Sequence, residues 1–193
     1  MPVHQCQPTC KGSIVPDTKP SRSKSVHHIA YTTRDAEATY DFYSNKLGLP
    51  LVHAENTVAE GGYFRHFFFG IGAGEAIAFF EVHDVGEDPN FKTEISTGLG
   101  LPPWANHIAF KLDTIEELND QVAFMHENGV GDILEINHGW CTSIYTEDPN
   151  GITVEFCVTT DAEEFEQTEE EALRQLRLPP SEIREHEPAL RLV

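Results

Sequence analysis

The sequence is poor in basic residues and has no long apolar run. Only 13 Lys and Arg residues oppose 32 Asp and Glu residues, which gives a formal charge of −19. Nucleic acids and anionic membrane surfaces need a basic footprint, so this balance argues against both as partners. No stretch approaches the roughly 20 apolar residues of a membrane span, and the first ten residues lack the apolar core of a signal peptide. We therefore expect a cytoplasmic protein.

Cysteine is also scarce, with four residues at positions 6, 10, 141 and 157. Cys141 and Cys157 fall in expected strands of a chain without an export signal, where thiols stay reduced. Cys6 and Cys10 lie in a stretch rich in Pro, Ser and Lys, and two such cysteines are weak evidence for a metal site. We expect no structural disulfide, and we interpret residues 1–25 as a flexible N-terminal arm.

The length of 193 residues, with 39% hydrophobic content, fits one well-packed domain and leaves no room for two large ones. We assign that domain to residues 26–160. Residues 161–193 form an acidic, helix-prone tail with apolar residues at Phe165, Leu173 and Leu176, and prolines at 179 and 180 stop the helix. The sequence leaves open whether this tail packs on the domain or on another subunit.

The same order of elements occurs twice in the chain. Residues 26–83 read as a strand, a helix and three strands, and residues 104–158 repeat that order after a connection rich in Pro and Gly. The expected strands cover 26–33, 49–56, 63–71, 75–83, 104–112, 130–136, 141–147 and 152–158, and the helices cover 35–47 and 114–128. The sequence therefore predicts an α+β fold in which two paired βαβββ modules form a curved sheet around a central cleft.

The repeat is visible in individual residues as well. His28 opens the first module as His107 opens the second, and Phe80-Glu81-Val82 matches Val154-Glu155-Phe156 near the end of each module. A pseudo-twofold relation between the modules would bring these groups together. Two imidazoles with one or two carboxylates suit a divalent ion of the Fe, Mn, Zn, Ni or Co group. We predict His28, His107 and Glu155 as metal ligands, with Glu81 as a candidate fourth ligand and His27 replacing His28 if the register shifts by one residue.

The segment 136–156 contains a His, a Tyr and a Glu in one strand-turn-strand unit. Asp148-Pro149-Asn150-Gly151 has the composition of a tight turn. The second strand alternates, so that Glu155 lies on the face opposite to the apolar residues at 152, 154 and 156. The carboxylate is therefore directed away from the bulk apolar layer.

The order of residues in this unit resembles the signature of the type I extradiol ring-cleaving dioxygenases, within the vicinal oxygen chelate (glyoxalase, bleomycin resistance and extradiol dioxygenase) superfamily. The resemblance is carried by Ile136, His138, Ile144, Tyr145, Asp148, Pro149, Gly151 and Glu155. It implies that Fe(II) is the most suitable metal, held by a triad with open positions, and that the substrate is a catechol-like aromatic or related vicinal diol cleaved with O2. It also implies that His138 is the acid-base group and that Tyr145 hydrogen-bonds a substrate hydroxyl.

Aromatic residues near these positions indicate a planar apolar substrate. We expect His66, Phe79 and Trp140 to line its binding site. By analogy with superfamily members that have two modules per chain, we also expect a homodimer.

Two other functions remain open. A fourth ligand from Glu81 would favour a redox-neutral lyase or isomerase of the glyoxalase or epimerase type, with Zn, Mn, Ni or Co as the metal and a displaced carboxylate as the base. The chain shows no clear basic cluster for glutathione or coenzyme A, which weighs against that alternative. The third possibility is a small-molecule-binding protein of the resistance type, without catalysis.

Overall fold

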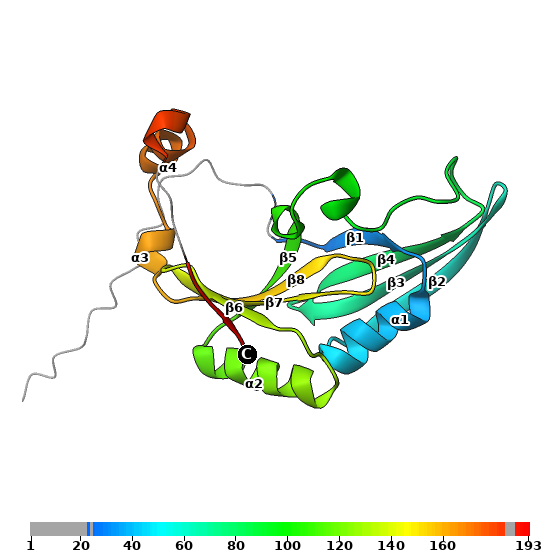
Figure 1. Ribbon diagram of the computed structural model, residues 1–193. Coiled ribbons are helices and arrows are strands. Elements are labelled where there is room, and N and C mark those ends of the chain that lie inside the picture. Colours follow the sequence, from blue (N-terminus) through cyan, green and yellow to red (C-terminus); the bar gives the residue numbers. More distant parts are fainter. Residues whose placement is uncertain (1–22, 24, 184–187) are drawn as a thin grey trace, which may run out of the picture.

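Two mixed β-sheets with their helices make up the protein (Figure 1). The computed structural model describes residues 23, 25–183 and 188–193, so the expected N-terminal arm, with Cys6 and Cys10, lies almost entirely outside the described residues. Cys141 and Cys157 are free thiols, as expected. Within the described part of the chain, no helix is long and apolar enough to cross a membrane.

The first module forms a four-stranded sheet in the order β1-β4-β3-β2. Its strands are β1 (His28–Thr33), β2 (Leu51–Ala59), β3 (Gly62–Gly72) and β4 (Glu75–His83). Helix α1 (Ala36–Tyr40) begins after Asp35, whose side chain accepts the Ala38 N–H, and continues as a π-helix over Asp41–Lys46. Gly48, with a φ of 78°, allows the chain to leave this helix.

The second module repeats this arrangement in a five-stranded sheet, β5-β8-β7-β6-β9. It contains β5 (His107–Leu112), α2 (Ile115–Glu127), β6 (Leu134–Asn137), β7 (Cys141–Glu147) and β8 (Thr153–Thr159). Thr114 and Glu117 cap α2 reciprocally, which is the capping box that the sequence indicates. In both modules the first strand runs parallel to the last strand of the repeat. The predicted α+β fold of two βαβββ modules is confirmed.

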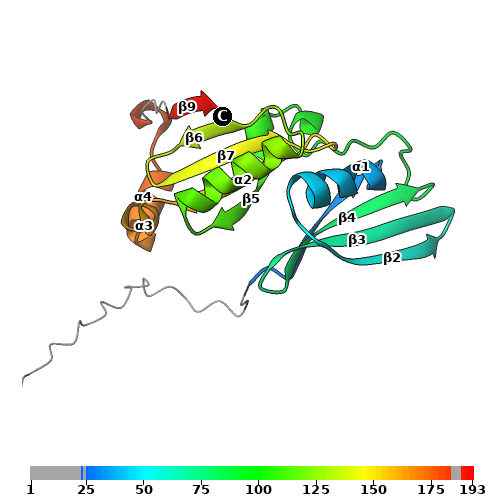
Figure 2. The ribbon, with the colours of Figure 1, turned by 90° about the horizontal axis from the view of Figure 1, so that it is seen from below.

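The C-terminal segment adds helices and one strand. Helices α3 (Ala162–Phe165) and α4 (Glu169–Leu176) precede a 3₁₀ turn at Pro180–Glu182. Strand β9 (Ala189–Leu192) then pairs antiparallel with β6. The sequence predicted a helical tail and missed β9, because a four-residue strand depends on its partner some 50 residues earlier rather than on its own pattern. In both ribbon views α3 and α4 lie beside the second sheet, on the side away from the first module (Figures 1 and 2).

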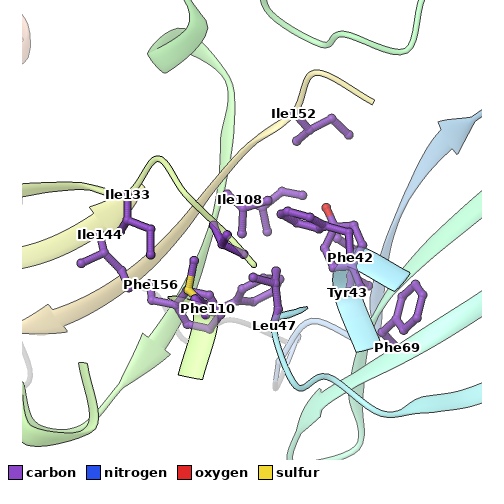
Figure 3. Close-up of a cluster of buried hydrophobic side chains, with 14 of the residues drawn as sticks. Phe42, Tyr43, Leu47, Phe69, Ile108, Phe110, Ile133, Ile144, Ile152 and Phe156 are labelled. Carbon is purple, nitrogen blue, oxygen red and sulfur yellow. The ribbon is translucent and has the colours of Figure 1, made fainter. Parts of the chain in front are cut away.

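Helices α1 and α2 cover the same face of the two sheets (Figure 2). The buried core lies on this face and contains side chains from both modules, among them Tyr43 and Phe69 from the first and Ile108, Phe110 and Phe156 from the second (Figure 3). We call the opposite face of each sheet the open face.

The turn after β7 joins the two modules. The hydroxyl of Tyr43, in the first module, donates to Asp148 Oδ2 at 3.1 Å, and the Asn150 side-chain amide donates to Thr39 Oγ1 at 3.3 Å. The Asp148 carboxylate also accepts the backbone N–H groups of Asn150 and Ile152, each at 2.8 Å. Burial raises the pKa of Asp148 above its usual value, although these hydrogen bonds oppose the shift. The turn that the sequence predicted therefore also fixes the second module against α1.

Candidate functional site

Glu155 and Tyr145 lie side by side on the open face of the second sheet. They are paired in the register of β7 and β8, and Ala109 of β5 pairs with Glu155 on its other side. Val154 and Phe156 point to the opposite face and belong to the core. Alternation along β8 therefore directs Glu155 to the open face, where its side chain is nevertheless well buried, at 5% exposed.

His107 contacts Glu155 directly. Its Nε2 atom lies 3.0 Å from Glu155 Oε2, and its Nδ1 atom lies 3.0 Å from the backbone oxygen of Trp104. A carbonyl oxygen can only accept a hydrogen bond, so Nδ1 carries the proton and donates to it. This fixes the imidazole so that Nε2 and a carboxylate oxygen face each other. Histidines that bind metal ions typically donate their other ring N–H to a backbone carbonyl in the way that His107 Nδ1 donates to Trp104.

Tyr145 extends this arrangement to His138. Burial raises the pKa of the Tyr145 phenol above its usual value, and the charge of Glu155 together with the hydrogen bond donated to it raises the pKa further. The phenol oxygen lies 3.0 Å from His138 Nε2. A protonated phenol has one proton, so when Tyr145 donates to Glu155, the Nε2–H of His138 donates to the phenol oxygen. We refer to His107, Glu155, Tyr145 and His138 as the polar line.

His28 belongs to the open face of the first sheet. Tyr31 and Thr33 of the same strand contact Phe79 and Thr39 on the helix-covered face. Because side chains alternate along a strand, His28 points to the opposite, open face. The His28 ring packs against Phe68 at 5.5 Å between centroids. Its Nδ1 lies 2.8 Å from Nδ1 of the neighbouring residue, His27.

The structure gathers part of the expected ligand set. His107 and Glu155 are in contact, whereas His28 is not grouped with them: among the described residues there is no cluster of three or more His, Cys, Asp or Glu side chains that could hold a metal ion. The donor chemistry of His107 and Glu155 nevertheless fits a divalent ion, since one imidazole nitrogen and one carboxylate oxygen face each other at 3.0 Å.

Glu81 does not occupy the position equivalent to Glu155, and the residue match inferred from the sequence is wrong here. Ala30 pairs with Ala78 in the first module, as Ala109 pairs with Glu155 in the second. Because the two strand-opening histidines correspond, Ala78 takes the place of the carboxylate. Glu81 lies three residues further along β4, which turns its side chain to the helix-covered face.

The Glu81 carboxylate is already engaged on that face. It accepts the backbone N–H of Ala36, at the start of α1, at 3.1 Å, it forms an ion pair with Arg65, and it lies 3.2 Å from His83 Nε2. Burial raises the pKa of Glu81, but the hydrogen bonds from Arg65, Ala36 and His83 outweigh it and hold the pKa below its usual value. Glu81 therefore ties helix α1 to the sheet.

Of the residues expected to line a substrate site, Phe79 lies elsewhere. It is fully buried in the core, 4.9 Å from the Tyr43 ring, because its strand position faces α1. The next residue, Phe80, faces the open side and stacks on His66 at 3.7 Å between centroids. The signal for Phe80 was present in the sequence, since alternation along β4 places either residue 79 or residue 80 on the open face.

Trp140 lies beside the polar line. Its ring stacks on His138 at 6.2 Å and on Phe165 of α3 at 4.8 Å between centroids. The contact with Phe165 was not foreseen, because the sequence showed only an apolar residue in a helical tail.

A family model described as the glyoxalase/bleomycin resistance protein/dioxygenase superfamily matches residues 25–156. The chain belongs to this superfamily. The match contains the first module, the second module up to the middle of β8 and every residue of the polar line, and it ends before the C-terminal segment. No curated protein sequence matches the chain.

Solved structures of the glyoxalase/bleomycin resistance protein/dioxygenase superfamily share the fold. A member from Frankia sp. EAN1pec is 18% identical with a TM-score of 0.53, covering 72% of this chain and 95% of its own. One from Alicyclobacillus acidocaldarius is 17% identical with a TM-score of 0.51, covering 74% of this chain and 98% of its own. A mutant of the fosfomycin resistance protein FosX from Listeria monocytogenes, in complex with Mn(II) and a dihydroxypropylphosphonic acid, is 21% identical with a TM-score of 0.48, covering 78% and 98%.

Proposed function

We propose that this superfamily member is a metal-dependent dioxygenase of the extradiol type, which cleaves a catechol-like aromatic or related vicinal diol with O2. The observation that carries the proposal is the polar line. It runs from two proposed ligands, His107 and Glu155, through the Tyr145 phenol to the His138 imidazole, with contacts of 3.0 Å at either end.

The proposed metal is Fe(II), held by His28, His107 and Glu155. Bound there, such an ion would supply Lewis-acid and electron-transfer chemistry to a diol and to O2. The engagement of Glu81 by Arg65 on the helix-covered face supports a set of three ligands over four. A set of three protein ligands would leave room at such an ion for both oxygens of a diol and for O2.

Tyr145 and His138 have separate roles in this proposal. A tyrosine phenol is protonated at neutral pH, and burial and the Glu155 charge raise the pKa of Tyr145 further. The phenol can therefore donate to a substrate oxygen, which orients the ring. An imidazole can accept and release a proton near neutral pH, so His138 suits general acid-base catalysis. Its Nε2 atom is the proposed site of that proton, 3.0 Å from the phenol oxygen.

The redox-neutral alternative has less support. It used Glu81 as a fourth ligand and Glu155 or Glu81 as the displaced base, and the Glu81 carboxylate is engaged by Ala36, Arg65 and His83. The polar line also provides an acid-base histidine that this alternative does not need.

The test combines metal analysis with O2 uptake. Protein purified without oxygen should contain about one iron per chain, and catechols should trigger O2 consumption with a ring-cleaved product. His138→Phe should lower kcat by about 10²- to 10⁴-fold, the usual contribution of a general acid-base group, with the iron content unchanged. The matched control is His53→Phe, on β2 of the other sheet, which should leave kcat within about twofold.

Two results would contradict the proposal. Tightly bound Zn, Ni or Co without O2 uptake would favour redox-neutral chemistry. Protein that retains no divalent metal from a metal-supplemented preparation would favour the small-molecule-binding alternative.

A further inference from the structure

The C-terminal segment contacts Trp140, which lies beside the polar line, although the family match ends at residue 156. Helix α3 carries Phe165, whose ring stacks on Trp140 at 4.8 Å between centroids with 27° between the planes. Phe165 remains 56% exposed. Burial of its own surface is therefore incomplete, and the contact with Trp140 is its main ring interaction among the described residues.

Backbone hydrogen bonds hold the same two pieces of chain together. The N–H groups of Thr160 and Asp161 both donate to the Trp140 carbonyl oxygen, at 2.8 and 3.0 Å. The Thr160 hydroxyl donates to the carbonyl oxygen of Gly139 at 3.0 Å. The loop before β7 is thus fixed to the start of α3 through the carbonyl groups of Gly139 and Trp140.

Trp140 in turn packs on His138. The two rings are 28° from parallel with 6.2 Å between centroids, and Nε2 of the same imidazole contacts the Tyr145 hydroxyl. The backbone N–H of His138 donates to the Cys141 carbonyl oxygen at 2.9 Å, which leaves the orientation of the ring to its side-chain neighbours.

We propose that Phe165 is a positioning residue for the acid-base group: it holds the Trp140 indole, and through the indole it holds the His138 ring toward Tyr145. The proposal rests on the function proposed above for His138. It assigns a role to residues 160–165, which lie beyond the family match. An aromatic pair of this kind contributes about 2- to 10-fold to the population of the stacked arrangement.

The test compares Phe165→Ala with Leu176→Ala in the full-length chain. Leu176 lies on α4 of the same segment and is 80% exposed, so its truncation controls for a general effect on the tail. Trp104 and Trp140 are the only tryptophans. A Trp104→Phe background, which changes an exposed side chain, therefore leaves Trp140 as the single fluorophore.

Two physical measurements decide the positioning role without reference to activity. In Phe165→Ala, acrylamide quenching of Trp140 fluorescence should rise about 2- to 10-fold, and the His138 ring resonances, assigned by their loss in His138→Phe, should shift. Phe165→Tyr should restore both values, and Leu176→Ala should change neither. Unchanged quenching and unchanged His138 resonances in Phe165→Ala would overturn the proposal.

Kinetics then separate this proposal from the proposed function. In an active enzyme, Phe165→Ala should lower kcat about 2- to 10-fold with KM and iron content unchanged, because the ligands lie on strands. An equal loss in Leu176→Ala would overturn the positioning role. A parent protein without O2 uptake would sink the dioxygenase proposal, whereas the fluorescence and NMR results would still decide whether Phe165 orients His138.

Discussion

At the scale of single residues, the third ligand is the sharpest question. His107 and Glu155 face each other at 3.0 Å, whereas His28 lies on the open face of the other sheet with its Nδ1 against His27. Both histidines open equivalent strands, and this equivalence is what assigns His28 to the proposed metal set.

His28→Ala should lower the affinity for a divalent ion by more than about 100-fold, since even outer-shell changes cost 10- to 100-fold. The matched control is His53→Ala, a histidine of the same sheet outside the proposed set. Anaerobic titration with Co(II), followed by its visible absorption, measures the affinity. A larger loss in His27→Ala would assign the ligand to the neighbouring residue instead.

At the scale of elements, the parallel pairing of β1 with β4 decides what Glu81 does. The register places Ala78 opposite Ala30, and Glu81 faces α1. Its carboxylate joins the start of the helix to Arg65 of β3. This is a contact between elements, and its loss should affect stability rather than metal binding.

Glu81→Gln should lower the free energy of unfolding at pH 7 by about 1.5 to 3 kcal/mol, the range for hydrogen bonds to a charged group. The folded-state pKa of Glu81 is lowered, so its contribution is present above the unfolded pKa of about 4.5 and is lost as the pH falls through the folded value. Denaturant unfolding at several pH values should show the difference from the parent shrinking in acid. Loss of bound metal at pH 7 would instead restore Glu81 as a ligand.

At the scale of the whole molecule, the 148–151 turn sets the two modules against each other. Tyr43 and Asp148 are 105 residues apart in the chain and form a buried hydrogen bond of 3.1 Å. The proposed metal set takes ligands from both modules, so this contact also bears on the site.

For the assembly we propose two copies of the 21.6 kDa chain, which sedimentation velocity would detect as a species of twice that mass.

Tyr43→Phe should destabilise the protein by about 1 to 3 kcal/mol at pH 7, because the buried Asp148 carboxylate loses a donor. Burial raises the folded-state pKa of Asp148. The protonated Asp148 therefore contributes its full stabilisation below the unfolded pKa of about 3.8, and this contribution is lost as the pH rises through the folded pKa. The effect of Tyr43→Phe should be largest at neutral pH in thermal unfolding. Tyr40→Phe, at a partly exposed tyrosine of the same helical segment, should change little.

The sequence by itself determined the features that depend on neighbours in the chain. Alternation and turn residues were enough for the presence of the strands of both modules and for the face of Glu155, although β5 begins three residues and β6 four residues later than expected. A capping box was enough for the start of α2. His138, Tyr145 and Glu155 lie within 18 residues, and the hairpin turn between the last two fixes their register. The duplication then indicated the paired modules.

Only the tertiary structure decided the features that join distant segments. Parallel strands such as β1 and β4 are connected by a long crossover and not by a tight turn. Their register is therefore set by packing against α1, and this register places Glu81 at a position that is not equivalent to Glu155. Strand β9 exists because β6 offers an edge to it, and Phe165 acquires its neighbour because α3 folds back onto Trp140. Such contacts depend on which surfaces meet in space. Short polar segments and isolated apolar residues have no sequence pattern from which these contacts can be predicted.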